Sequence, residues 1–205
     1  MTRNSAVLLV GGAALAGLLG GCRVEKSTHG DGKDVNISTP FGGMHVRTNG
    51  ADAMTGIGLP SYPGAEAAYD DGNDNRSANV DMSFGAFQLR VKKADFRTDD
   101  AQDKVEAFYR DGMKRFGDVI ACRNGHAVGS PERTVEGLTC DNEGNHHISV
   151  DDHAGNNKLE LKAGSKTHLH IVEIEPDGSG TKFGLVALDL PGKVTADERD
   201  GKGTE

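Results

Sequence analysis

The sequence is short of aromatic residues and of positive charge. It contains no Trp, three Tyr and seven Phe in 205 residues, and 36% of the residues are hydrophobic. This length and composition argue for one domain with a modest core. Lys and Arg number 23 against 31 Asp and Glu, so the net charge is −8. A surface of this sign repels phosphate groups, and we therefore expect no binding to nucleic acid.

Sequence motifs of catalysis and of metal binding are also lacking. No Gly-x-Ser-x-Gly or Ser-x-x-Lys motif stands between a predicted strand and a predicted helix, where a nucleophile would be presented. Neither Cys-x-x-Cys nor His-Glu-x-x-His spacing occurs. The sequence therefore predicts a protein that is not an enzyme and has no cofactor.

The N-terminus carries a targeting segment. One base and no acid occur in residues 1–5, and the apolar run from Ala6 to Leu19 spans 14 residues. A membrane-spanning helix needs about 20 apolar residues, whereas a run of this length is typical of the apolar part of a secretory signal. We therefore interpret residues 1–21 as a signal peptide that is removed from the mature protein.

The end of this segment, Leu19-Gly20-Gly21-Cys22, resembles the lipobox of bacterial lipoproteins. The resemblance implies that Cys22 is lipidated with acyl chains, palmitate among them, and begins the mature chain. Arg23 follows where Asp would signal retention at the inner membrane in such families, so the resemblance implies the outer membrane, facing the periplasm or the exterior. The alternatives are an ordinary signal peptide that contains a Cys and a buried helix hairpin.

The mature chain divides into four regions by composition. Residues 22–34 are polar and lack periodicity, which predicts a lipidated Cys with a flexible tether. Residues 35–56 form a hairpin and a linker, and the hairpin at 35–48 resembles the strand-turn-strand repeat of bacterial adhesin-type β-proteins. Residues 57–191 are the expected globular domain, and residues 192–205 are a charged tail.

The fold class expected for the globular domain is α+β, an antiparallel β-sheet packed by one main amphipathic helix. A second hairpin is predicted at 77–98, and a helix at about 99–117 begins with Asp99 as its cap and ends at Gly117. Its apolar residues recur at helical spacing: Val105, Phe108, Tyr109, Met113 and Phe116. Further strands are predicted at 118–122, 137–140, 157–163, 168–175 and 181–190.

The same succession of elements supports a second resemblance. Tyr62-Pro63-Gly64-Ala65, the hairpin, the helix beginning near Asp99 and the late strands resemble uncharacterised envelope lipoproteins of soil bacteria over about 59–190. This resemblance implies an antiparallel α+β fold and brings no activity with it.

Two of the three cysteines remain after lipidation of Cys22. Cys122 and Cys140 form an even pair in an oxidising compartment, which predicts a disulfide that staples a weak core. The alternative is two reduced, half-buried thiols.

Five of the eight histidines lie within residues 146–170, and one interpretation of this concentration is a metal site. His168 and His170 would share one strand face, and His147 with Asp151, Asp152 or His153 would complete the ligand set from a loop. Histidines on a sheet surface are the simpler interpretation. The acidic loop at 70–75 similarly suggests calcium, but its spacing departs from that of an EF-hand loop and favours a solvated hairpin loop.

Two functions follow as expectations. The first is a lipid-anchored protein of the cell envelope that acts as a structural or partner-binding module, held to the membrane through its N-terminal lipid. The alternative is a periplasmic ligand-binding lipoprotein, with a divalent metal as ligand through the His-rich strands.

Overall fold

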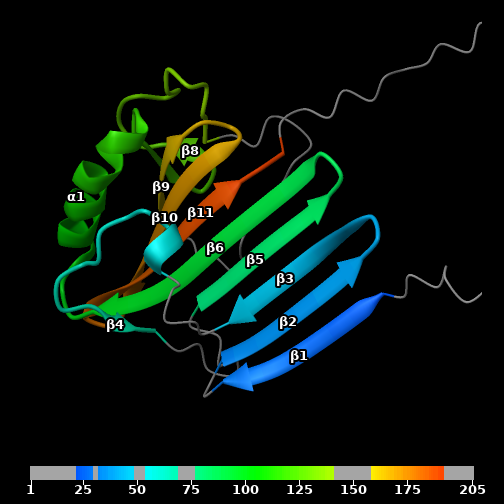
Figure 1. Ribbon diagram of the computed structural model, residues 1–205. Coiled ribbons are helices and arrows are strands. Elements are labelled where there is room, and N and C mark those ends of the chain that lie inside the picture. The colour runs from blue at the N-terminus through cyan, green and yellow to red at the C-terminus, as the bar shows by residue number, and fades with distance from the viewer. Residues whose placement is uncertain (1–21, 30–31, 49–53, 69–76, 141–157, 192–205) are drawn as a thin grey trace, which may run out of the picture.

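The computed structural model describes residues 22–29, 32–48, 54–68, 77–140 and 158–191. Over these residues the fold is a mostly antiparallel β-sheet with one α-helix, in agreement with the α+β class (Figure 1). Within the same ranges, no helix is both long enough and apolar enough to cross a bilayer.

The described strands form one 11-stranded sheet in the order β1-β2-β3-β5-β6-β11-β10-β9-β7-β8, with β4 paired to β6. The strand bounds are β1 Arg23–His29, β2 Gly32–Thr39, β3 Gly42–Thr48, β4 Glu66–Ala67, β5 Ser77–Phe84, β6 Phe87–Thr98, β7 Ile120–Arg123, β8 His126–Ala127, β9 Leu159–Gly164, β10 His168–Asp177 and β11 Gly180–Asp189. We call β1, β2, β3 and β5 the N-terminal half and β7, β9, β10 and β11 the C-terminal half. The long strand β6 joins the halves, because it pairs with β5 and with β11.

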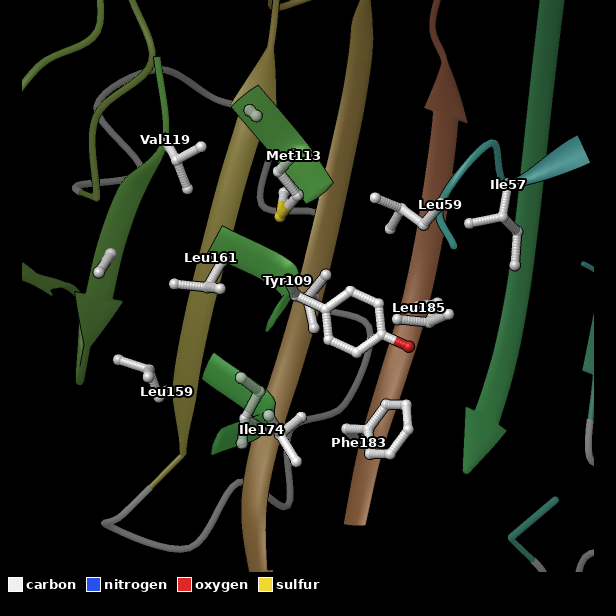
Figure 2. Close-up of a cluster of buried hydrophobic side chains, with 14 of the residues drawn as sticks. Ile57, Leu59, Tyr109, Met113, Val119, Leu159, Leu161, Ile174, Phe183 and Leu185 are labelled. Atoms are coloured by element: carbon white, nitrogen blue, oxygen red, sulfur yellow. The ribbon is translucent and has the colours of Figure 1, made fainter. Parts of the chain in front are cut away.

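Helix α1, Gln102–Met113, covers the C-terminal half of the sheet (Figure 1). Its buried side chains Val105, Tyr109 and Met113 are spaced four residues apart, so they line one face of the helix. Figure 2 shows Tyr109 reaching from α1 toward Leu185 and Phe183 of β11. Burial of these large side chains is the main favourable term for folding of this half.

The ends of the helix differ in one respect from expectation. Ala101, not Asp99, is the N-cap residue, and its side chain makes no capping hydrogen bond. Asp100, the next carboxylate, is engaged instead by Tyr62 and Lys104 at 2.9 and 2.7 Å. At the other end the helix continues as a 3-10 turn, η2 Lys114–Phe116, and stops at Gly117 with φ of 120°, as predicted.

The segment before β4 closes the core from the side of α1. After the 3-10 turn η1, Met54–Gly56, the side chains of Ile57 and Leu59 are buried in the cluster that includes Tyr109 and Leu185 (Figure 2). The residues just after a predicted linker are therefore part of the core. The sequence does not predict this role, because the glycine and proline residues of the segment are typical of an exposed turn.

Three expectations about the strands need correction. Residues 23–29 form β1 and pair with residues 32–38 of β2, so these parts of the expected tether at 22–34 are strands. Residues 137–140 form no strand, although Thr139 makes an isolated bridge with Arg133. The predicted boundary at 56/57 also separates strands of one sheet, since β3 pairs with β5. In the first and third cases the strand pairing depends on a neighbour that local periodicity does not reveal.

The hairpins at 35–48 and 77–98 are confirmed as β2–β3 and β5–β6. Their alternating residues give the N-terminal half one apolar and one polar face. Two apolar rows cross the strands on the face away from α1, namely Ile37–Met44–Met82–Leu89 and Val35–Val46–Val80–Val91. Cross-strand pairs of this kind contribute about 0.2–1 kcal/mol each.

Candidate functional sites

Cys22 is an exposed free cysteine directly before β1. Because Arg23 pairs with Ser38, Cys22 lies beside the end of β2. A group attached to this thiol would therefore be joined to the sheet itself, with no spacer between them.

Cys122 and Cys140 form the predicted disulfide, with their Cα atoms 5.4 Å apart. Both residues are buried, and with Ile120 and Leu138 they make a small cluster separate from the helix-covered core. The Cys140 sulfur also lies 3.5 Å from the carbonyl oxygen of Ala121. The bond therefore fastens the 123–139 loop to β7, and its role is structural.

A row of polar side chains crosses six adjacent strands on the face of the sheet that carries α1. We call it the polar row. Register places its members side by side, one from each of β2, β3, β5, β6, β11 and β10: Asn36, His45, Asp81, Arg90, Asp189 and His168.

Ion pairs link the middle of the polar row. Arg90 Nε lies 2.6 Å from Asp81 Oδ1, and Arg90 also contacts Asp189 at 3.3 Å. The second carboxylate oxygen of Asp189 lies 2.9 Å from His168 Nδ1. At the other end, Asp34 accepts from Arg47 and lies 3.4 Å from His45 Nε2. Asp81, Arg90 and Asp189 therefore place charges of alternating sign at the centre of the row.

The hydrogen bonds of the row favour its charged forms. The hydrogen bond from His168, with the nearby Arg90 guanidinium, lowers the pKa of Asp189 below its ordinary value. Hydrogen bonding to Asp81 and its negative charge raise the pKa of Arg90. Since all of these side chains remain partly exposed, solvent screens the pairs, and each contributes little to stability.

His168 and His170 share one face of β10, as the sequence predicts, but they have different partners. His168 is exposed and pairs with Asp189. The His170 ring stacks on Phe116 with centroids 3.7 Å apart, and burial lowers its pKa. The two imidazoles therefore do not converge on a common point.

Among the residues that the structure describes, no group of three or more His, Cys, Asp or Glu is arranged to hold a metal ion. His147 and His153, the other candidate ligands, lie outside the described residues, as do the acidic residues of the 70–75 loop. Metal binding through these loops therefore stays a prediction.

An open hollow of about 680 Å³ lies at the C-terminal end of α1, lined by Arg110, Lys114, Gly117, Asp118, Val119, Val135 and Glu136. Both signs of charge border it. Asp118 already accepts a hydrogen bond from the Val135 amide. The hollow combines no nucleophile with a base, so its residues suggest no reaction.

Comparison with known proteins gives no relative: no family model, no curated protein and no solved structure matches the chain.

The polar row was not predicted from the sequence. Arg90 and Asp189 are 99 positions apart, and each is an ordinary polar residue of an alternating strand. Their meeting depends on the pairing of β6 with β11. No short segment of the sequence predicts this pairing.

Proposed function

We propose that this protein is a lipid-anchored component of the cell envelope whose sheet binds another envelope component and performs no catalysis. The observation that carries the proposal is Leu19-Gly20-Gly21-Cys22 at the end of a short apolar segment, with Cys22 exposed directly before β1. A lipid on Cys22 would hold the edge of the sheet at the membrane surface. An outer-membrane location, facing the periplasm or the exterior, is part of the same proposal.

The polar row is the surface that we propose for partner binding. Arg90, Asp81 and Asp189 are exposed or nearly so. Figure 1 shows that α1 lies over the side of the sheet away from β5 and leaves this strand uncovered. A surface on which negative and positive charges alternate can bind a partner whose own charges are complementary to it. It is poorly suited to nucleic acid, because an anionic polymer binds to a surface that is predominantly basic.

The anchor is tested by Cys22→Ser in the full chain. We expect the variant to leave the membrane fraction, while the unaltered protein stays in it after a high-salt wash. Mass spectrometry of the N-terminal peptide should show the acyl chains on Cys22. Retention of the Ser variant after the same wash would refute lipid anchoring.

Partner binding is tested by crosslinking in intact cells followed by capture of the protein. Asp81→Lys with Asp189→Lys should abolish a crosslink that the unaltered protein forms, because the row then carries charge of one sign. Asp111→Lys is the matched control, since Asp111 lies in an exposed ion pair on α1. Equal loss in the control, or an unchanged crosslink in the double variant, would exclude the polar row as the binding surface.

A further inference from the structure

The β2–β3 and β5–β6 hairpins end in tips without charge. Each turn is two residues long, because Thr39 pairs with Gly42 and Phe84 pairs with Phe87. Neither 37–44 nor 82–89 contains a charged residue, although 26% of the chain is Asp, Glu, Lys or Arg. Water-exposed turns usually carry polar or charged side chains, so this lack of charge needs an explanation.

Phenylalanine is concentrated at the same tips. Phe41 in the β2–β3 turn is 84% exposed and Phe84 at the end of β5 is 43% exposed. Phe87, opposite Phe84, is half-buried. The chain has seven Phe and no Trp, so these tips hold three of its few large aromatic side chains. Exposed aromatic side chains clustered at one place indicate a surface that contacts an apolar partner, such as lipid or the apolar surface of another protein.

The β2–β3 tip is held in a defined shape. The Thr39 hydroxyl donates to the carbonyl oxygen of Gly42 at 2.7 Å and accepts from the Phe41 amide at 3.3 Å. A Cβ at Gly42 would lie 2.1 Å from the Ser83 carbonyl oxygen, so only glycine allows the adjacent strand to approach this closely. The exposed position of Phe41 is therefore fixed by the turn.

The tips lie at the same end of the sheet as Cys22. Register sets Cys22 beside Thr39, which pairs with Gly42, which in turn pairs with Phe84. Three strand spacings of about 4.8 Å separate β1 from β5, so Cys22 and Phe84 lie roughly 14 Å apart. Figure 1 shows the start of β1 and the β2–β3 and β5–β6 turns at this one end.

We propose that the two uncharged hairpin tips insert into the lipid bilayer beside acylated Cys22 and fix the orientation of the sheet on the membrane. This inference rests on the proposed lipid anchor. Acyl chains hold a protein at a bilayer but leave its body free to rotate, whereas Phe41 and Phe84 add two further apolar contacts at separate points. Insertion is favourable because the tips bring no charge that must be desolvated.

The orientation has a consequence for the polar row. Asp81 and Arg90 are three residues from Phe84 and Phe87 along their strands, or about 10 Å at the rise of a β-strand. With the tips in lipid, the row lies close to the membrane surface. A partner of the polar row would then be a component that is itself held at that surface.

The absence of Trp makes a direct test possible, because Phe41→Trp introduces a single fluorescent reporter. The full chain, purified from membranes, is reconstituted into phosphatidylethanolamine and phosphatidylglycerol vesicles with brominated acyl chains. We expect the Trp to lose about half or more of its emission relative to vesicles without bromine. Phe84→Trp is a second reporter. Val135→Trp is the control, since Val135 is 89% exposed in the C-terminal part and should not be quenched.

The outcomes separate this inference from the anchor. Protein that floats with the vesicles but shows unquenched Trp at both tips keeps its anchor and overturns tip insertion. A blue shift without quenching means contact with protein, such as a second copy, and also overturns it. Protein that does not float refutes the anchor. In that case Cys22→Ser with Phe41→Trp is titrated with excess brominated vesicles, and quenching supports tip insertion while its absence overturns it.

Discussion

Ile37 of β2 and Ile174 of β10 both point to the apolar side of an alternating strand, yet they differ in burial. Ile174 is completely buried beneath α1 and the 57–59 segment, whereas Ile37 is only half-buried. Among the residues of β1, β2 and β3 whose side chains the structure describes, 23–28, 32–39 and 42–48, none is buried, while every strand from β9 to β11 contributes to a core cluster. Apolar strand residues are therefore buried in the C-terminal half, both beneath α1 and in the separate cluster of Ile171, Val186 and Leu188, whereas those of β2 and β3 stay partly exposed.

The difference also bears on function. The C-terminal half uses its apolar residues for stability, together with the Cys122–Cys140 disulfide. The N-terminal half keeps a polar face, an apolar face and two exposed tips next to Cys22. We infer that the C-terminal half supplies most of the stability and that the N-terminal half provides the surface for the membrane, while the polar row proposed for the partner spans strands of both halves.

The largest expected effect comes from a matched pair of substitutions. Ile174→Ala should lower the free energy of unfolding by about 2–5 kcal/mol, because it leaves a cavity in a covered core. Ile37→Ala should cost about 1 kcal/mol or less, since a half-exposed side chain loses less apolar contact and leaves no closed cavity. Urea unfolding measures both. Equal losses would contradict the distinction between the two halves.

Removal of the disulfide should have the next largest effect. Replacement of both Cys122 and Cys140 by Ser should lower stability by about 3 kcal/mol, because the bond closes a loop with a sequence separation of 18 residues. A reductant should destabilise the unaltered protein similarly and leave the double variant unchanged. Peptide mapping without reduction should recover the linked pair, and alkylation of both thiols under denaturing conditions would refute it.

A smaller effect concerns pH. Burial lowers the pKa of His170, so the unfolded state binds its proton first and stability should fall as pH decreases below about 6.5. His170→Phe keeps the stacking on Phe116 and should remove this part of the loss. Exposed His126→Gln is the control. The lowered pKa of Asp189 acts separately, because its stabilisation is lost only as pH falls below about 4. Identical slopes for His170→Phe and the unaltered protein between pH 7 and 5 would contradict this account.

The smallest expected effect is that of chelation. EDTA should leave the melting temperature unchanged above the ordinary His pKa of about 6.5, because the buried cluster around Tyr109 consists of apolar side chains whose packing requires no metal. Thermal unfolding with and without EDTA measures this directly. A fall of several degrees that disappears on replacing His168 and His170 with Gln would favour the metal-binding lipoprotein instead.

Local pattern predicted much of the fold. The apolar residues of α1 recur at helical spacing, the hairpins alternate, and Gly117 ends the helix, because each of these features depends on residues close together in the chain. The pair of cysteines was likewise sufficient to predict the disulfide. These are properties of short segments, and the sequence by itself determines them.

The tertiary structure decided which strands, and therefore which residues, are neighbours in the sheet. Residues 23–29 lack a strand pattern but become β1, because β2 offers them a row of backbone partners. Arg90 meets Asp189, and the tips with Phe41 and Phe84 come to lie next to Cys22, only through strand order and register. The backbone hydrogen bonds between paired strands fix which residues become neighbours, even when these residues are far apart in the chain. Local residue patterns do not specify which strands pair or in which register.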